Sequence, residues 1–125
     1  MRLPLDTHIL LRWLDDAPEL SAEGRALIAD AGNVVVVSAV SVWEIRIKEG
    51  LGKLRLPLTF AEVLEREPFE KLPVTVHHAH RLKGLPAHHR DPFDRMLIVQ
   101  AQCENLTLVT ADEILGRYDV SSLVV

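Results

Sequence analysis

The chain has 125 residues, 48% of them hydrophobic, which fits one domain over residues 1–125 with a core of its own. No run approaches the roughly 18 consecutive apolar residues of a membrane span, and the N-terminal MRLPLDTH lacks an apolar signal core, so we expect a cytoplasmic protein without membrane association. The net charge of −4 argues against a protein that coats nucleic acid through a basic surface, and the single cysteine, Cys103, excludes internal disulfides and cysteine-rich zinc clusters.

The N-terminal half alternates short apolar runs with helical patterns. In chain order we expect a strand at 3–5, a helix at 7–14, a helix from the N-cap Ser21 to Gly32, a strand at 34–37 and a helix at 40–50. Pro4 cannot donate a backbone hydrogen bond, so the first strand should be short or irregular. The four consecutive valines at 34–37 are typical of a strand that is covered on both faces of a parallel sheet.

The C-terminal half continues this alternation. We expect a small strand or an extended turn at 53–56, a helix at 58–66, a strand at 69–74, a helix at 77–83, a loop at 84–90, a helix at 92–104 and strands at 106–110 and 121–125. Strands that alternate with helices favour a three-layer α/β/α sandwich with a central, mainly parallel sheet. Core packing is expected to use most of the apolar surface of Trp13, Trp43 and the leucines at 51–56.

Five carboxylates stand where these strands and helices meet. They are Asp6, Glu44, Asp91, Asp94 and Asp112. Because the carboxyl ends of parallel strands emerge at one edge of a sheet, we expect most of these acids to converge there. Such a cluster persists when some members are protonated or when a cation neutralises them. Hard oxygen ligands select Mg²⁺ or Mn²⁺ over zinc. If four of the acids form one site, they account for the whole net charge.

Each acid also has a purely structural explanation. Asp91 precedes a proline and fits a helix N-cap, while Asp94 lies in the first turn of the same helix. Ser41 and Glu44 have the spacing of a capping box. The two acids that follow strands are also placed to cap helices. The metal-site hypothesis therefore depends on the shared position at one sheet edge, and Asp91 is expected to act mainly as a cap.

Four motifs occur in a specific order and spacing: LDTHILLRWL, SAVSVWEI, HRDPFDRMLIVQA and LVTAD. Together they resemble the PIN-domain ribonucleases, in particular the VapC-type toxins of bacterial toxin–antitoxin pairs, over nearly the whole chain. The resemblance implies that the catalytic and metal-binding acids are Asp6, Asp94, Asp112 and Glu44, the last directly or through water. It implies supporting roles for Asp91, Thr7, Ser38 and Thr110.

The activity that the resemblance implies is hydrolysis of RNA phosphodiester bonds with Mg²⁺ or Mn²⁺ as cofactor. Candidate contacts to the RNA substrate are His88, His89, Arg90 and Arg95. Other basic residues, Lys48 among them, are further candidates for phosphate contacts. The resemblance also implies a homodimer and a cognate antitoxin, whose segment lays apolar side chains into a groove between helices and often projects a basic residue to the metal site.

Other interpretations stay open at this point. A PIN-type nuclease of RNA maturation, without an antitoxin, would carry the same acids. A non-catalytic Mg²⁺-binding signalling module of the receiver type would need paired acids after its first strand and a late lysine, which we do not find. A zinc site at His77 and His80 lacks a cysteine or carboxylate at a suitable spacing. We expect those two histidines and His78 to lie at the surface.

Overall fold

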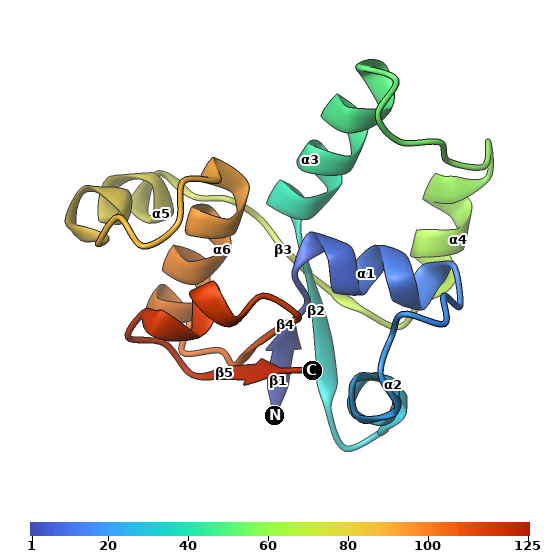
Figure 1. Cartoon of the computed structure of the whole chain (residues 1–125), viewed down its shortest axis with the longest axis horizontal. Coiled ribbons are helices and arrows are strands. Elements are labelled where there is room, and N and C mark those ends of the chain that lie inside the picture. Colours follow the sequence, from blue (N-terminus) through green and yellow to red (C-terminus); the bar gives the residue numbers. More distant parts are fainter.

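The centre of the molecule is a parallel β-sheet, described for residues 1–125 by a computed structural model (Figure 1). Its strands are β1 (Arg2–Pro4), β2 (Val34–Ser38), β3 (Glu70–Leu72), β4 (Leu108–Thr110) and β5 (Ser122–Val124). β2 pairs in parallel with β1 and β3, β4 pairs in parallel with β5, and a parallel bridge between Leu5 and Val109 joins β1 to β4. The strand order across the sheet is therefore β3-β2-β1-β4-β5.

Pro4 explains why pairing between β1 and β4 is reduced to one bridge. The N–H of Leu5 donates to Val36 of β2, whereas the N–H of Asp6 donates to Val109 on the β4 side. Because backbone groups alternate between the two sides of a strand, the Pro4 nitrogen faces β4, where it has no hydrogen to donate. The prediction that Pro4 makes the first strand short is confirmed.

Helices cover both faces of the sheet. They are α1 (Thr7–Leu14), α2 (Ala22–Ala29), α3 (Ala39–Gly50), α4 (Phe60–Arg66), α5 (Val76–Arg81) and α6 (Pro92–Cys103), with two 3₁₀ segments, η1 (Leu82–Gly84) and η2 (Glu113–Arg117). In Figure 1, α1, α2 and α4 lie on one side of the strands and α5 and α6 on the other.

Two apolar clusters fill the spaces between these layers. Val35 and Val37 belong to the cluster that contains residues of α1, α2 and α4, whereas Val36 belongs to the cluster that contains residues of α6 and η2. Alternate valines of β2 therefore face opposite layers, as in any strand with both faces covered. The predicted α/β/α sandwich with a parallel sheet is confirmed.

The predicted elements are present, mostly with shorter bounds. The strands predicted at 69–74 and 106–110 each have three residues, and the helix predicted at 77–83 is α5 continued by η1. Residues 53–56 form neither a strand nor a helix. The segment η2 was not predicted, because five residues that include a glycine carry too little periodicity. None of the helices combines the length and the hydrophobicity that crossing a membrane requires.

The predicted capping box of Ser41 and Glu44 is wrong. The N-cap of α3 is Ser38, whose hydroxyl accepts the N–H of Val40 at 3.1 Å. Ser41 lies inside the helix, and its buried hydroxyl has no hydrogen-bond partner. The carboxylate of Glu44 is therefore not engaged in capping, which removes capping as an explanation for an acid at this position.

The burial of two side chains, His78 and Trp43, is the opposite of what the sequence predicts. His78, expected at the surface, is buried; it completes a capping box with Thr75 and its Nε2 lies 2.8 Å from Glu104 Oε1. Trp43, expected to contribute to the core, is 60% exposed. Both outcomes depend on which face of a helix meets the sheet, and short amphipathic stretches leave this undetermined.

Candidate metal centre at the carboxyl edge of the sheet

The predicted acids lie around the point where the strand order reverses. After β3 the chain returns to form β4 on the opposite side of β1, so the carboxyl ends of β1 and β4 form a crevice. Asp6 follows β1 and Asp112 follows β4, while Glu44 and Asp94 lie on α3 and α6, which pack against each other. This edge is the upper one in Figure 1.

Thr110 links Asp6 to Asp112. Asp6 is buried and is the N-cap of α1, with its Oδ1 accepting the N–H of Ile9 at 2.8 Å. The hydroxyl of Thr110 donates to Asp6 Oδ2 and accepts the N–H of Asp112 at 3.0 Å. Burial raises the pKa of Asp6, and the hydrogen bonds from Thr110 and Ile9 offset part of that rise.

Glu44 is joined to the same region by Thr7. The hydroxyl of Thr7, the residue after Asp6, donates to Glu44 Oε1 at 2.6 Å. Lys48 donates to the other oxygen, Oε2, at 2.5 Å. The hydrogen bond to Glu44 raises the pKa of Lys48, and the charges of Glu44, Asp91 and Asp94 add to this effect. Lys48 therefore stays protonated and compensates the buried Glu44 carboxylate.

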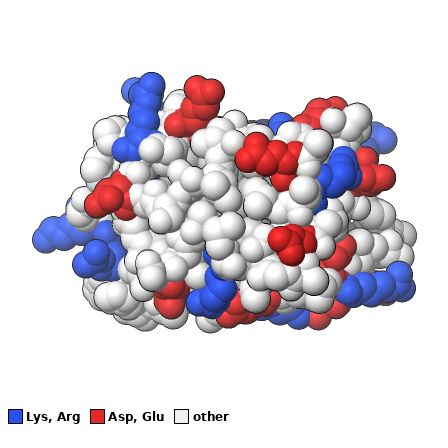
Figure 2. Space-filling view, turned by 90° about the horizontal axis from the view of Figure 1, so that it is seen from below, with Lys and Arg blue, Asp and Glu red and all other residues white.

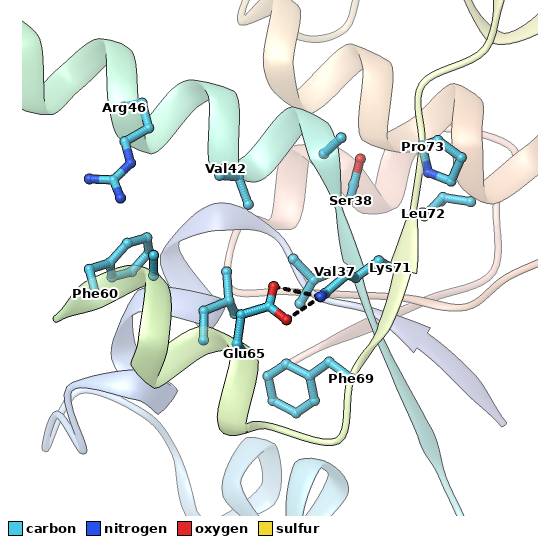
Figure 3. Close-up of a pocket in the computed structure, with 13 residues that line it drawn as sticks. Val37, Ser38, Val42, Arg46, Phe60, Glu65, Phe69, Lys71, Leu72 and Pro73 are labelled. Atoms are coloured by element: carbon cyan, nitrogen blue, oxygen red, sulfur yellow. Dashed lines mark hydrogen bonds and ion pairs between the residues drawn. The ribbon is translucent and has the colours of Figure 1, made fainter.

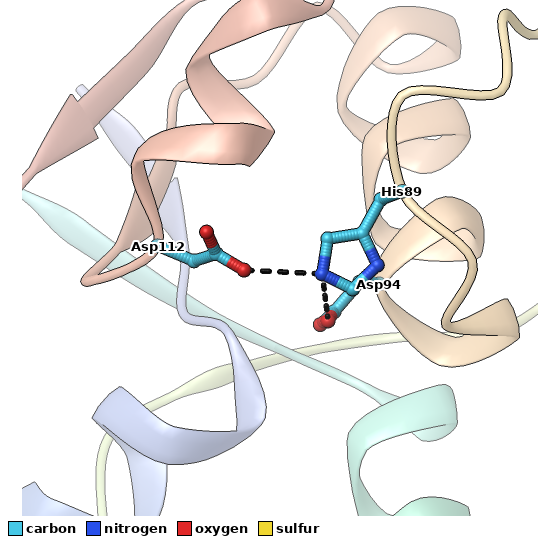
Figure 4. Close-up of side chains that lie close together, drawn as sticks. All are labelled: His89, Asp94 and Asp112. Carbon is cyan, nitrogen blue, oxygen red and sulfur yellow. Dashed lines mark hydrogen bonds and ion pairs between the residues drawn. The ribbon is translucent and has the colours of Figure 1, made fainter.

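His89 lies between Asp94 and Asp112 (Figure 4). Its Nε2 is 3.1 Å from Asp112 Oδ2 and 3.5 Å from Asp94 Oδ2. Its Nδ1 accepts the N–H of Asp91 at 3.0 Å, so the ring proton belongs on Nε2, which faces the two carboxylates. The imidazole thus occupies the space between two predicted metal ligands.

The electrostatics of Asp94 show that the acids act on one another. Burial, followed by the charges of Asp91 and Asp6, raises the pKa of Asp94 to about 7; His89 opposes this effect and Glu44 adds to it. A divalent cation would relieve this repulsion. The donors that the cluster offers are mainly carboxylate oxygens, which suit Mg²⁺ or Mn²⁺. Ligand atoms of His89, Asp94 and Asp112 lie within 4.8 Å of one another. The residues therefore fit such an ion.

Asp91 acts as the predicted cap of α6. Its Oδ1 accepts the N–H groups of Phe93 at 2.8 Å and of Asp94 at 3.1 Å. It thereby holds the first turn of α6 that carries Asp94. Its charge also contributes to the raised pKa of Asp94.

Ser38 does not lie in hydrogen-bond contact with any of the acids. Its hydroxyl donates to Gln100 Oε1 at 2.5 Å, while Gln100 Nε2 donates to the carbonyl of Pro73 at 3.2 Å. These bonds connect the carboxyl ends of β2 and β3 to α6. The predicted support from Ser38 is therefore limited to helix capping and to the anchoring of α6, whereas Thr7 and Thr110 contact acids directly.

The side chain of Arg95, a predicted contact to RNA, is bound within the protein. Its guanidinium donates to the carbonyls of Leu85 at 3.3 Å and Pro86 at 2.8 Å, which ties the loop before α6 to the protein. His88 packs edge to face against the ring of Tyr118, with centroids 5.0 Å apart. Arg90 is exposed and has no hydrogen bond or ion pair to another side chain, so it alone of the four candidates has its side chain free.

Sequence reasoning missed two residues of the site. Lys48, a candidate for phosphate contact in the sequence, is paired with Glu44. The four-residue spacing of the two on one helix is the signal that indicates this pair. Tyr118, whose hydroxyl accepts the N–H of His89 at 2.8 Å, positions the histidine loop. No local pattern marks Tyr118, because the contact spans 29 positions of the chain.

The opposite edge of the molecule has a different surface. Figure 2 shows this face from below, with acidic and basic side chains mixed around its margin and a largely uncharged centre. That face has no continuous basic surface, in agreement with the net charge of −4.

Comparisons with known proteins agree with this geometry. A family model described as the PIN domain matches residues 4–121. Among solved structures, VapBC2 from Rickettsia felis bound to a promoter DNA fragment matches with a TM-score of 0.74 and 18% identity, covering 98% of each chain. FitAcB from Neisseria gonorrhoeae matches with a TM-score of 0.69 and 21% identity, covering 97% of this chain and 96% of the other. No curated protein gives a significant sequence match.

Proposed function

The chain belongs to the PIN-domain family, and from that premise we propose that it is an endoribonuclease dependent on Mg²⁺ or Mn²⁺ and acts as the toxin of a toxin–antitoxin pair. The observation that carries the proposal is the linkage of four carboxylates at the sheet edge through Thr7, Thr110 and His89. The sequence lacks the paired acids after the first strand and the late lysine that a receiver-type signalling module would need. The similar structures, VapBC2 and FitAcB, are toxin–antitoxin complexes, which supports the toxin role.

The proposed ligands are Asp6, Asp94 and Asp112, with Glu44 binding the ion directly or through water. A bound divalent ion would supply a water of lowered pKa and neutralise charge at the scissile phosphate. Both oxygens of Glu44 accept a hydrogen bond, from Thr7 and Lys48, and both oxygens of Asp6 accept one, from Ile9 and Thr110. Each oxygen keeps one further lone pair for an ion. In the absence of a cation, Lys48 and His89 compensate the same carboxylates.

An RNA substrate is proposed on the strength of the family resemblance and of the free side chain of Arg90. The cluster is acidic and would repel a phosphodiester, so binding depends on the cation that the carboxylates hold. Arg90 stands directly before Asp91, at the start of α6, and has no ion-pair partner in the protein. It is therefore a basic side chain that is free to meet a neighbouring phosphate.

The proposed site for the antitoxin segment is an apolar groove between α3 and α4 (Figure 3). The groove has a volume of about 450 Å³, and eight of its 13 lining residues are hydrophobic, including Val42, Phe60 and Phe69. Charged side chains border it, with Lys71 paired to Glu65. Val42 lies on α3, the helix that also carries Glu44. A homodimer stays a prediction, which light scattering would test.

Cleavage of mixed RNA by the purified protein tests the nuclease. Wild type with Mn²⁺ should cleave, EDTA should abolish cleavage, and Asp94→Asn should reduce the rate about 100-fold or more, because it removes a carboxylate from the cluster. Asp15→Asn makes the same chemical change at an exposed position away from the cluster and should leave the rate unchanged. Equal rates for wild type and Asp94→Asn would contradict the site.

The toxin role needs a separate experiment in cells. Expression of the chain should arrest growth, and co-expression of a small protein encoded just upstream should relieve the arrest. The Asp94→Asn variant should be harmless at the same expression level. Harmless expression of an active wild-type nuclease would instead favour a role in RNA maturation without an antitoxin.

A further inference from the structure

An exposed aromatic pair borders the acid cluster. Trp43 on α3 and Phe93 on α6 meet edge to face, with ring centroids 5.3 Å apart and planes at 84°. Phe93 is half-buried and packs against the apolar cluster of α6, whereas Trp43 is 60% exposed. The indole N–H of Trp43 has no hydrogen-bond partner in the protein, in contrast to that of Trp13, which donates to Glu67 at 3.2 Å. Core packing therefore does not account for Trp43.

Each ring directly precedes a proposed catalytic acid. Trp43 is followed by Glu44 and Phe93 by Asp94, so both helices present an aromatic ring beside the carboxylate that they contribute. Consecutive helical residues point about 100° apart. Glu44 is buried and directed to Thr7, which leaves Trp43 at the rim of the same site. The aromatic pair therefore joins α3 and α6 at the residues that directly precede Glu44 and Asp94.

The chemistry of this rim suits an unpaired nucleobase. Every base has a π-face, and proteins that bind single-stranded nucleic acid stack its bases on exposed aromatic rings in addition to contacting phosphates with basic side chains. The protein has a net charge of −4, so long-range attraction to a polyanion is weak. Stacking does not depend on net charge, and Arg90 at the start of α6 provides a free cation for an adjoining phosphate.

We propose that Trp43, supported by Phe93, is a platform on which one unpaired base of a single-stranded RNA stacks, so that the adjoining phosphodiester lies at the acid cluster. The proposal rests on the nuclease function proposed above and adds a residue that positions the substrate without taking part in the chemistry. A base in a duplex is already stacked and has no free face for Trp43. Val42 and Arg46 of the same helix line the proposed antitoxin groove, whereas Trp43 and Phe93 do not.

Binding to an inactive protein tests the platform apart from catalysis. In the Asp94→Asn background with Mn²⁺, Trp43→Leu should weaken binding of a fluorescent 8- to 12-nucleotide single-stranded RNA by about tenfold, a typical effect of losing one stacked base. Trp43→Phe should retain most of the affinity, since it keeps an aromatic face. Leu58→Ala removes a fully exposed apolar side chain elsewhere and serves as the matched control. All variants should keep the melting temperature of the parent protein.

An abasic scan of the RNA gives a readout that a structural defect would not reproduce. Removing one base at a time should identify a position where the loss weakens binding to the parent but not to Trp43→Leu. Equal effects in both proteins at every position would overturn the platform, as would unchanged affinity in Trp43→Leu. Weaker dimerisation or antitoxin binding by Trp43→Leu, with RNA binding unaltered, would assign the ring to a protein partner and would also overturn it.

Cleavage kinetics separate this inference from the proposed function. In the protein with Asp94 intact, Trp43→Leu should raise KM for single-stranded RNA while kcat changes little, because stacking stabilises the bound substrate and the transition state alike. An absence of Asp94-dependent cleavage would contradict the nuclease itself. Asp94-dependent cleavage with the same KM in wild type and Trp43→Leu would leave the nuclease standing and overturn only the platform.

Discussion

Thr110 illustrates how one buried hydroxyl positions two carboxylates of the site. It donates to Asp6 and accepts from the backbone of Asp112, so it uses both its donor and an acceptor. Asp6 belongs to the end of β1 and Asp112 to the end of β4, two strands joined by a single bridge. The hydroxyl therefore replaces part of the pairing that the sheet lacks at this point.

Substitution of Thr110 tests this role. Thr110→Val keeps the shape but leaves a buried carboxylate oxygen and a backbone N–H without a partner, so the free energy of unfolding should fall by about 1–3 kcal/mol. Thr110→Ser keeps the hydroxyl and should restore most of the hydrogen bonding. Urea denaturation of the two variants beside wild type measures the difference. Equal stability of Thr110→Val and wild type would show that the hydroxyl is not needed.

At the scale of elements, the N-terminus of α6 combines a cap with a proposed catalytic position. Asp91 caps the helix, Pro92 occupies its first position, and Asp94 follows in the first turn. Arg95 ties the preceding loop to the helix through backbone carbonyls. The loop carries His89, so the geometry of Asp94 and of its histidine neighbour is determined by one helix end.

Two substitutions at Asp91 separate capping from charge. Asp91→Ala removes the acceptor of two backbone N–H groups and should cost about 1 kcal/mol of stability. Asn is nearly as good an N-cap as Asp, so Asp91→Asn should keep the stability and cleave RNA within a few-fold of wild type. Thermal denaturation and the RNA cleavage assay measure both properties. A loss of cleavage in Asp91→Asn comparable to that in Asp94→Asn would mean that Asp91 is a metal ligand and not mainly a cap.

At the scale of the whole molecule, the clustering of acids makes stability depend on pH and on metal. The folded state raises the pKa of Asp94 from 3.8 to about 7. Between these values the folded protein keeps a proton that the unfolded chain has released. The contribution of Asp94 to stability is therefore complete below pH 4 and is lost as the pH rises through about 7.

Thermal unfolding in EDTA between pH 5 and pH 8 tests this linkage. The melting temperature of wild type should fall relative to that of Asp94→Asn as the pH rises, because Asn carries no charge that the cluster repels. Mn²⁺ should raise the melting temperature of wild type more at pH 8 than at pH 5.5, since a proton competes with the ion for Asp94. A wild-type and Asp94→Asn difference that is the same at both ends of the range would contradict the raised pKa.

Local patterns in the sequence were sufficient for the alternation of elements, the cap at Asp91 and the placement of four acids at one edge. These features depend on hydrophobic periodicity, on capping preferences and on the rule that parallel strands end together, all of which act over a few residues or follow from topology. Pro4 likewise predicts a short first strand, because its missing N–H affects strand pairing at that position alone.

Only the tertiary structure decided which side chains meet across the layers. Ser38 bonds Gln100 over 62 positions, and His89 reaches Asp112 over 23, so neither contact leaves a local signal. The exposure of Trp43 and the burial of His78 depend on which helix faces meet the sheet. The sequence alone therefore indicated which acids gather at the sheet edge. The hydrogen-bond partners of those acids and the exposed face of Trp43 were determined by packing, in which long-range contacts outweigh local preference.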